Sequence, residues 1–409
     1  MVLGGGGPVG WHAPPVTRRI DGAERRARLA VRHRHVAAAR TDDVVAITEG
    51  LVGLHSSDPV TVYLSAAARM VTPDLGAVDA ALYDQRSLLR HHAMRRTLWV
   101  FGHDTARAAH HGATVAVAAV QRRNLLRSLE AAGIGDPAGW LDAADAQVVD
   151  LLTGADPLTA REVGLRLPEL TRPVPVGSLT SPTLQPAHTR VLLVLGFQGR
   201  VVRAQPTGTW INGQYRWASA RSWFPDGFDA DGADPRTAAA ELARRWLRTF
   251  GPGTQTDLQW WAGWTVATTK RALADVGAVA VELDEGVGFV LPDDVDPVGP
   301  VPPSTVLLPG LDPSTMGWKQ RAFHLDPEHV PVMFDRNGNG GPAIWVDGRI
   351  VGGWTQRGDG TIAVHLLDDI GAEATTAVEA QAHDLERLLG PVRFTTRFPA
   401  PFQAALARP

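Results

Sequence analysis

Two pairs of adjacent histidines are the residues whose type most directly suggests chemistry, since imidazole is the commonest side-chain ligand of transition metals. The pairs are His91-His92 and His110-His111. Adjacent residues on a strand point to opposite faces, and no carboxylate stands at a fixed companion offset from either pair. The sequence contains no cysteine, which excludes thiolate ligands, disulfides and a cysteine nucleophile. We therefore expect no bound metal and no cofactor.

A glycine-rich run, RNGNGG at residues 336–341, is the second candidate for chemistry, because such loops can cradle phosphate. The run lacks the GxxxxGK[ST] pattern and no helix pattern follows it, which argues against nucleotide hydrolysis. The glycines favour a tight turn instead. Shortly after it, Val346-Asp347-Gly348-Arg349 predicts the turn of a β-hairpin.

Composition indicates an ordinary globular protein, with 44% apolar and 20% charged residues. A chain of 409 residues exceeds what one core usually organises, so two to four domains are expected. The net charge of -3 argues against a protein that coats nucleic acid by bulk electrostatics. Only Lys270 and Lys319 are lysines, so arginine, whose planar fork suits phosphate, carries nearly all the positive charge.

The sequence also predicts where the protein resides. No stretch reaches the roughly 18 uncharged apolar residues that a membrane-spanning helix needs. The first residues lack the apolar core of a signal peptide. Together with the absence of cysteine, these features predict a cytoplasmic protein that does not contact membranes.

The elements that would position any site follow a repeated order: short helices, then a hairpin. This order is typical of winged-helix units, and the last quarter of the chain changes to short apolar strands separated by Gly and Asp. The expected fold class is α+β, with tandem winged-helix units and a small C-terminal β-barrel-like domain. The expected boundaries are a flexible tail at 1–20, winged-helix units at 21–103, 104–228 and 229–296, and the β domain at 297–409.

Several local predictions are specific. Residues 234–250 form a strongly amphipathic pattern, with Ala238, Leu242, Trp246 and Phe250 on one stripe. Thr159 and Glu162 have the spacing of a helix capping box. Near the end of the chain, VRFTTRF at residues 392–398 predicts a final strand.

Four segments in order resemble the AlkZ/YcaQ-type winged-helix DNA glycosylases: GLHSSDPVTVYLSAAARM at 53–70, RHHAMRRTLWVF at 90–101, LLPGLDPSTMGWKQR at 307–321 and RNGNGGPAIWVDGRIVGGW at 336–354. The resemblance spans nearly the whole chain. It implies three winged-helix units and a β domain that clamp duplex DNA. It also implies hydrolysis of the N-glycosidic bond of alkylated or crosslinked purines.

In that family the catalytic pair lies in a Gln-x-Gln or Gln-x-Asp segment, and the corresponding residues here are His55-Ser56-Ser57, followed by Asp58. A histidine with an ordinary pKa near 6.5 can accept a proton from water. Ser57 would orient that water, and Asp58 would compensate the positive charge that develops on the sugar. The alternatives are that Ser57 and Asp58 only cap the helix beginning at Pro59, and that His55 packs or contacts phosphate.

The resemblance places further residues at the DNA. Candidate contacts are His92, Arg95, Arg96, Lys319, Arg321, Arg349 and Trp354. The alternatives are a solvated strand edge for the first three and a surface cluster for Lys319 and Arg321. For Trp354 the alternative is packing in a core, which is common for tryptophan in small β units.

Two functional hypotheses follow from these patterns. The first is a lesion-directed DNA glycosylase, and the second is a regulator or lesion sensor that binds DNA without catalysis. Both predict binding to double-stranded DNA that weakens steeply with salt, and hence association with the nucleoid. Three tandem units in one chain favour a monomer, because a single helix-turn-helix normally dimerises to read two half-sites.

Overall fold

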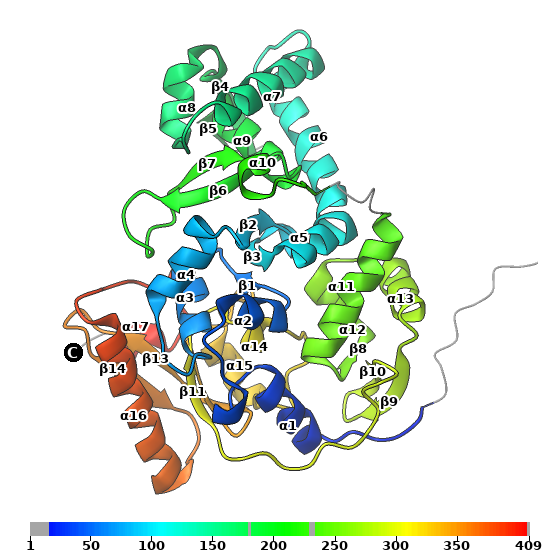
Figure 1. The fold of residues 1–409 in the computed structure, drawn as a ribbon, viewed down its shortest axis with the longest axis vertical. Helices are drawn as coiled ribbons and strands as arrows, with labels where there is room; N and C mark the ends of the chain where they lie inside the picture. Colours follow the sequence, from blue (N-terminus) through cyan, green and yellow to red (C-terminus); the bar gives the residue numbers. More distant parts are fainter. Residues whose placement is uncertain (1–15, 179–180, 229–233, 407–409) are drawn as a thin grey trace, which may run out of the picture.

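The chain forms a mixed structure of helices and small sheets, as the expected α+β class required. The computed structural model describes residues 16–178, 181–228 and 234–406. Within these residues the strands form two three-stranded, one four-stranded and two two-stranded sheets, all with antiparallel pairing. Figure 1 shows an upper lobe, made of the middle of the chain, above a larger lower body. No helix in the described ranges has both the length and the apolar character needed to cross a bilayer.

The first region begins with an arginine-rich helix and ends in a hairpin. Its elements are α1 (Gly22–Arg32), α2 (Val44–Gly50), β1 (Leu54–His55), α3 (Pro59–Ala67), α4 (Leu75–Asp79), β2 (Leu88–His92), β3 (Leu98–Gly102) and α5 (His103–Ala109), with short helical turns at Ala37–Ala39, Ala80–Asp84, Met94–Arg96 and His110–Thr114. The sheet order is β1-β3-β2. All five residues of β2 and of β3 are buried, so this hairpin lies inside the protein.

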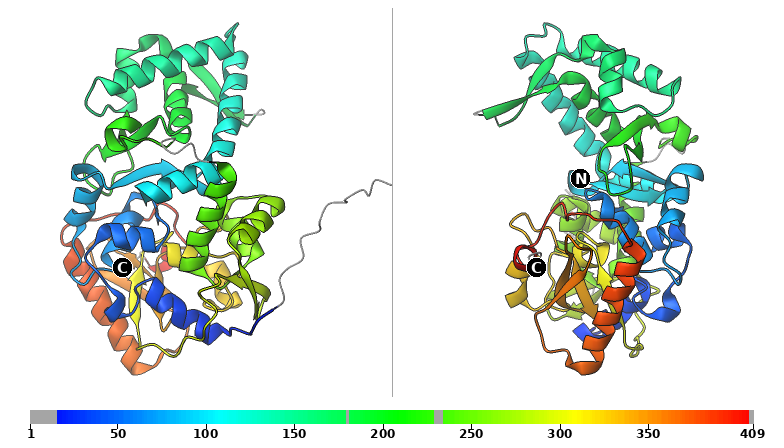
Figure 2. Two further views of the ribbon diagram at one scale, coloured as in Figure 1. Left: turned by 45° about the vertical axis from the view of Figure 1, so that its right-hand side comes forward. Right: turned by 90° about the vertical axis from the view of Figure 1, so that its left-hand side faces the viewer.

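The upper lobe has a hydrophobic core of its own, built around Leu141, Val191, Leu192 and Trp217. Its elements are α6 (Val115–Ala131), α7 (Pro137–Thr153), α8 (Ala160–Arg166), a short helical turn at Pro168–Leu170, β4 (Pro173–Ser178), β5 (Ser181–Pro186), α9 (Ala187–Phe197), β6 (Val201–Pro206), β7 (Tyr215–Ser219) and α10 (Ala220–Trp223). Both views in Figure 2 show this lobe above the lower body, and Val202, Ala218 and Trp223 of the lobe belong to the core of that body. The predicted capping box of Thr159 and Glu162 is present at the start of α8.

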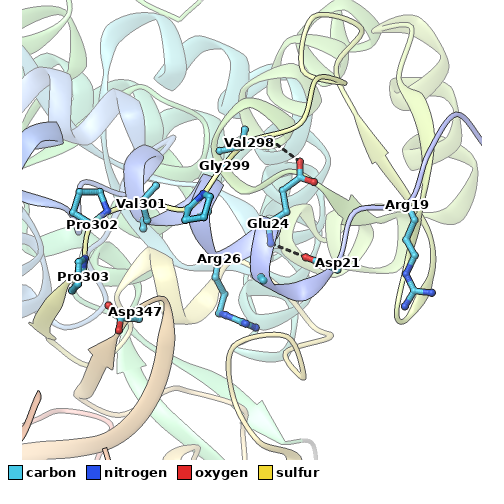
Figure 3. Close-up of a pocket in the computed structure, with 14 residues that line it drawn as sticks. Arg19, Asp21, Glu24, Arg26, Val298, Gly299, Val301, Pro302, Pro303 and Asp347 are labelled. Carbon is cyan, nitrogen blue, oxygen red and sulfur yellow. Dashed lines mark hydrogen bonds between the residues drawn. The ribbon is translucent and has the colours of Figure 1, made fainter. Parts of the chain in front are cut away.

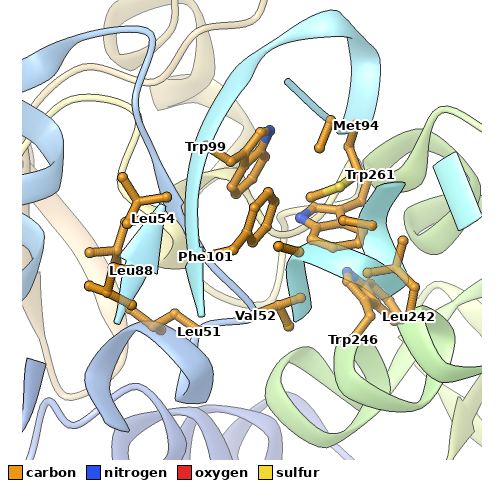
Figure 4. Packing of buried hydrophobic residues seen from close by; sticks show 14 of the residues in the cluster. Leu51, Val52, Leu54, Leu88, Met94, Trp99, Phe101, Leu242, Trp246 and Trp261 are labelled. Atoms are coloured by element: carbon orange, nitrogen blue, oxygen red, sulfur yellow. The ribbon is translucent and has the colours of Figure 1, made fainter. Parts of the chain in front are cut away.

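The third region packs onto the first. Its elements are α11 (Pro235–Phe250), β8 (Gly253–Thr254), α12 (Gln255–Ala262), α13 (Val266–Asp275), β9 (Val279–Leu283) and β10 (Gly286–Val290). The predicted amphipathic helix is confirmed, because α11 buries its whole apolar stripe. Trp246 of α11 and Trp261 of α12 belong to the same core as Trp99 and Phe101 of β3 (Figure 4).

The C-terminal region is a four-stranded antiparallel sheet with a long helix packed against it. Its elements are β11 (Thr305–Leu308), α14 (Pro313–Met316), a short helical turn at Pro327–His329, α15 (Val330–Met333), β12 (Ala343–Val346), β13 (Arg349–Gln356), β14 (Ile362–Leu366), α16 (Gly371–Leu389) and α17 (Gln403–Leu406). The predicted hairpin turn joins β12 to β13. Asp347 and Gly348 both have positive φ there, at 48° and 77°, as a tight two-residue hairpin requires.

The predicted final strand at 392–398 is wrong, because this segment pairs with no strand. Its backbone bonds to side chains instead: Phe394 N–H donates to Gln356 Oε1, and Arg397 N–H donates to Asp58 Oδ2. At the other end, residues 1–15 of the predicted tail lie outside the described residues. Thr17 and Ile20 donate backbone hydrogen bonds to Ala280 and Glu282, so this part lies along β9.

A buried ion pair joins the first region to the C-terminal region. The guanidinium of Arg69, just after α3, lies 2.8 Å from the carboxylate of Asp312, and neither side chain is exposed to solvent. Ser65 donates to the same carboxylate at 2.6 Å. Burial alone would raise the pKa of Asp312, but Arg69 and Ser65 hold it below its usual value. α3 is therefore anchored beyond its C-terminal end.

Candidate functional site

The turn at residues 55–58 is held by backbone contacts on both sides. His55 pairs with Trp99 across β1 and β3, and Ser56 N–H donates to Leu98 O at 2.7 Å. Asp58 is the N-cap of α3 and accepts from Val60 N–H, so the predicted cap is present. Its second oxygen accepts from Arg397 N–H at 2.9 Å. The Asp58 carboxylate can accept further hydrogen bonds besides these two, since each oxygen has two lone pairs.

His55 lies deeper than the sequence indicated. It is 3% exposed, its ring centroid lies 4.9 Å from that of Trp99, and its Nδ1 accepts from Ser57 N–H at 3.4 Å. Burial, and after it the positive charge of Arg95, lowers its pKa to about 3. The expected pKa near 6.5 is therefore corrected: the imidazole is neutral at pH 7 and is a weaker base than assumed.

The other two candidate residues of the turn, Ser57 and Asp58, differ in their exposure to solvent. Ser57 is half-buried, whereas the neighbouring Ser56 is 1% exposed. The Ser57 hydroxyl receives only a long contact from Leu98 N–H, at 3.5 Å, so it can turn toward another partner. Asp58 is 5% exposed, and burial raises the pKa of its carboxyl although the Arg397 and Val60 N–H groups oppose the shift. The turn thus presents one accessible hydroxyl and a carboxylate with raised proton affinity.

Two of the predicted DNA-contacting arginines meet on one tryptophan. The guanidinium carbons of Arg95 and Arg321 lie 4.0 Å and 5.4 Å from the centre of a Trp260 ring. Burial lowers the pKa of each arginine to about 10, so both stay charged at pH 7. Within the described ranges neither has a carboxylate at ion-pair distance. We call Arg95, Arg321 and Trp260 the Trp260 cluster; it offers positive charge without an internal counter-ion.

Arg96 and Lys319 are exposed beside residues of this cluster in the sequence. Arg95 and Arg96 both have positive φ, at 53° and 66°, which is uncommon for any residue with a Cβ and is unusual twice in a row. The backbone N–H of Lys319 is held by the Asp257 carboxylate at 3.0 Å. Trp260 was not singled out from sequence, and no local signal distinguishes it from the tryptophans next to it.

The remaining predicted contacts lie elsewhere. His92 is 8% exposed and its ring stacks on Phe197 at 4.4 Å. Trp354 is 1% exposed and its indole N–H donates to Leu308 O at 2.8 Å, in keeping with the core alternative. Arg349 is exposed at the β12–β13 turn, where its charge lowers the pKa of Arg26 after the larger effect of burial.

The paired histidines do not gather ligands. His91 Nε2 lies 3.0 Å from His110 Nδ1, and both rings pack against Phe228. Among the residues that the structure describes, no group of three or more His, Cys, Asp or Glu side chains could hold a metal ion. In the glycine-rich loop, Asp335 accepts from the backbone N–H groups of Asn337 and Asn339, which closes it as a turn.

A cavity of about 620 Å³ lies between α1 and residues 298–303 (Figure 3). Its charged walls are already satisfied: Glu24 pairs with Arg18 and Arg28, and Arg26 donates to Phe323 O. None of its lining residues belongs to the 55–58 turn. This cavity is therefore separate from the 55–58 turn.

Arginines without carboxylate partners supply the kind of positive charge that nucleic-acid-binding proteins direct at phosphate. Residues 48–388 match the family model described as DNA glycosylase AlkZ-like, so the chain belongs to this family. The solved structure of Streptomyces sahachiroi DNA glycosylase AlkZ has the same fold, with a TM-score of 0.69. It is 21% identical, and the match covers 93% of this chain and 99% of that one.

A search of curated proteins finds no match. The resemblance seen in the sequence is confirmed by the family match, which supports a DNA-repair glycosylase with DNA as its partner. Sequence reasoning missed Arg90, whose Nε donates to the Ser56 hydroxyl at 3.1 Å and so contacts the turn directly.

Proposed function

We propose that this protein hydrolyses the N-glycosidic bond of alkylated purines, crosslinked ones included, in double-stranded DNA. The observation that carries the proposal is the family match over residues 48–388, which includes the 55–58 turn. The unpaired charges of the Trp260 cluster supply attraction for the DNA backbone. Arg96 and Lys319 extend that surface, with Arg349 as a further contact.

The proposed chemistry uses the weakness of the bond. A purine alkylated on a ring nitrogen is cationic, so it leaves without being protonated and the transition state resembles an oxocarbenium ion. Ser57 positions the water, whose oxygen forms the new bond to the sugar C1′ while the C1′–N bond breaks and its electron pair goes to the base. Asp58 stabilises the cationic sugar and receives the water proton, since burial raises the pKa of this carboxyl. Neutral His55 fixes the turn and is the alternative acceptor.

At the level of the fold, we propose that the chain is a set of tandem winged-helix variants with a β-barrel-like C-terminal unit. The hairpins β2–β3, β6–β7 and β9–β10, each preceded by helices, support the three units. The antiparallel sheet β11-β12-β13-β14 supports the fourth. We further propose that it acts as a monomer on DNA in the cytoplasm.

The test is a single-turnover assay of base release from duplexes that carry an N3- or N7-methylpurine. Asp58→Asn keeps a good N-cap residue but removes the charge, so we expect a loss of about 10²–10³ in rate. Asp136→Asn is the matched control, because Asp136 caps α7 in the same way. If Asp58→Asn releases base as fast as wild type, the assignment of Asp58 fails.

A second function has one observation in its favour: the buried His55, with its pKa of about 3, is a poor proton acceptor. A lesion sensor that binds DNA without hydrolysis would tolerate such a residue. Wild-type protein that binds methylpurine duplexes tightly yet releases no base would select the sensor. His55→Ala would then alter neither binding nor base release, whereas a glycosylase needs the ring to hold Ser57.

A further inference from the structure

Close to the 55–58 turn, two arginines lie over one tyrosine, and a third, Arg397, acts electrostatically on one of them, Arg203. Arg90 belongs to β2, Arg203 to β6, and Arg397 to the segment before α17. The guanidinium carbon of Arg90 lies 4.6 Å from the ring centre of Tyr215, and that of Arg203 lies 5.9 Å from it. The Arg397 guanidinium donates to Ser57 O at 3.2 Å. We call Arg90, Arg203, Arg397 and Tyr215 the Tyr215 cluster.

The cluster carries three positive charges, of which Arg397 also acts electrostatically on the Asp58 carboxyl. Within the described part of the chain no carboxylate lies at ion-pair distance from any of its arginines. Arg90 bonds neutral groups, namely the hydroxyls of Ser56 and Tyr83. Burial lowers the pKa of Arg203 to about 10, and the charges of Arg90 and Arg397 add to this effect. Cations held this close to one another favour an anion between them.

Two polar atoms in the cluster are buried and have no hydrogen-bond partner: the hydroxyl of Tyr215 and Nε of Arg203. The Tyr215 side chain belongs to a residue that is only 7% exposed. Buried polar groups are nearly always hydrogen-bonded in folded proteins, so two unpartnered donors in one cluster indicate an absent partner. Both atoms can donate a hydrogen bond, which an anionic oxygen would accept.

We propose that the Tyr215 cluster binds one phosphate of the DNA backbone, next to the nucleotide that meets the 55–58 turn. The proposal rests on the proposed function, which places DNA at this turn. Planar guanidiniums match phosphate oxygens in pairs, and the tyrosine hydroxyl supplies a further donor. Since Arg397 contacts both Ser57 and the cluster, a phosphate held there fixes the strand within one residue of the proposed water site.

The cluster also links the upper lobe to the lower body. Gly213, in the β6–β7 loop, lies so close to Arg397 that an added Cβ would stand 2.8 Å from its Nη1. In the same loop the ring of Trp210 lies 5.0 Å from that of Tyr63 in α3. A phosphate bound by Arg203 and Arg397 would therefore bridge this hairpin to the turn, and binding the strand would hold the two parts together.

The test measures affinity rather than hydrolysis. Duplexes carry a stable abasic-site analogue and one neutral methylphosphonate, placed in turn at each phosphate flanking the analogue. For wild type we expect one position at which neutralisation weakens binding by about tenfold. In the variants Arg203→Gln and Arg397→Gln, the methylphosphonate at that position should cause no further loss of binding affinity. Arg387→Gln, on the exposed face of α16, is the control and should keep the full effect.

Tyr215→Phe separates binding from folding. Its hydroxyl has no partner in the free protein, so removing it should leave the thermal midpoint unchanged or raise it, while affinity for the abasic duplex falls several-fold. Equal methylphosphonate effects at every position, or additive effects in the variants, would overturn the phosphate site and leave the glycosylase proposal intact. Failure of wild type to bind any of the duplexes would reject both proposals.

Discussion

The arginines of α1 and most of those of the Trp260 and Tyr215 clusters are largely buried, yet among the residues that the structure describes only the first set has carboxylate partners at ion-pair distance. Arg25 pairs with Glu285 at 2.7 Å, and Arg28 pairs with Glu24 and Asp294 at 2.6 Å and 2.7 Å. In the Trp260 and Tyr215 clusters the contacts are aromatic rings, hydroxyls and carbonyls. The difference agrees with two uses of buried arginine: a paired one joins elements, and we propose that an unpaired one keeps its charge for an external anion.

Acid is the largest perturbation that we expect, and it leaves the arginines of both regions charged. Seven buried histidines have folded-state pKa values below 6.5: His33, His35, His55, His91, His92, His188 and His324. Below pH 6.5 the unfolded chain binds more protons than the folded one. The contribution of these histidines to stability is therefore complete above pH 6.5 and falls as the pH drops below it, by up to about 1.4 kcal/mol per pH unit for each such histidine.

Urea unfolding at pH 7, 6 and 5 measures this slope. His92→Phe is the informative variant, because both ring nitrogens of His92 are buried without partners while the ring stacks on Phe197. The free energy of unfolding of this variant at pH 7 should equal or exceed that of wild type. Its dependence on pH should be weaker by the amount that one titrating histidine contributes. If the pH dependence of this variant equals that of wild type, His92 does not contribute to the loss of stability in acid.

Breaking a paired arginine gives the next largest effect. Asp312→Ala leaves Arg69 buried and unpaired, so the free energy of unfolding should fall by about 3–5 kcal/mol. The urea midpoint at pH 7 measures it. If unfolding is unchanged, pairing does not stabilise this region, and the contrast between the two sets of arginines fails.

A matched pair of substitutions sharpens the contrast. Arg28→Gln removes a buried partner of two carboxylates and should lower the thermal midpoint. Arg321→Gln removes an arginine without a carboxylate and should leave the midpoint unchanged or higher. Its effect should appear in DNA binding, where the slope of log affinity against log salt falls by about 1. The reverse pattern would show that the Trp260 cluster is structural.

The smallest expected effect on stability is that of an exposed ion pair, which tests whether pairing stabilises the fold when the two side chains are not buried. Arg248 and Asp293 form an ion pair at 2.6 Å, with side chains 54% and 64% exposed. Arg248→Gln should leave the urea midpoint where it is, because exposed pairs are screened by water and salt. A clear loss here would mean that pairing, rather than burial, explains the stability of the α1 region.

Local chemistry in the sequence predicted several elements well. The stripe of α11, the Thr159–Glu162 capping box and the Asp347-Gly348 turn each depend on residues within one element or one turn of the chain. The family resemblance located the 55–58 turn, and the cap at Asp58 could be predicted from Asp-Pro alone. These features need no knowledge of the tertiary structure.

Features built from distant segments escaped prediction. Residues 392–398 have strand-forming composition, but Asp58 and Gln356 take their backbone N–H groups. The pKa of His55 depends on burial against Trp99 and on Arg95, which lies 40 positions along the chain. Likewise, no sequence pattern near Arg90 or Arg203 predicts that both lie over Tyr215, because only the folded chain brings them together.

The left-handed backbone at Arg95 and Arg96 has a consequence for how this surface tolerates change. Glycine or asparagine would adopt these φ values with less strain, by roughly 1 kcal/mol or more for each residue. Random variants chosen only for folding should therefore accumulate small residues at both positions. Variants selected for DNA binding should keep arginine. Selection for folding and selection for DNA binding are therefore expected to favour different residues at these two positions.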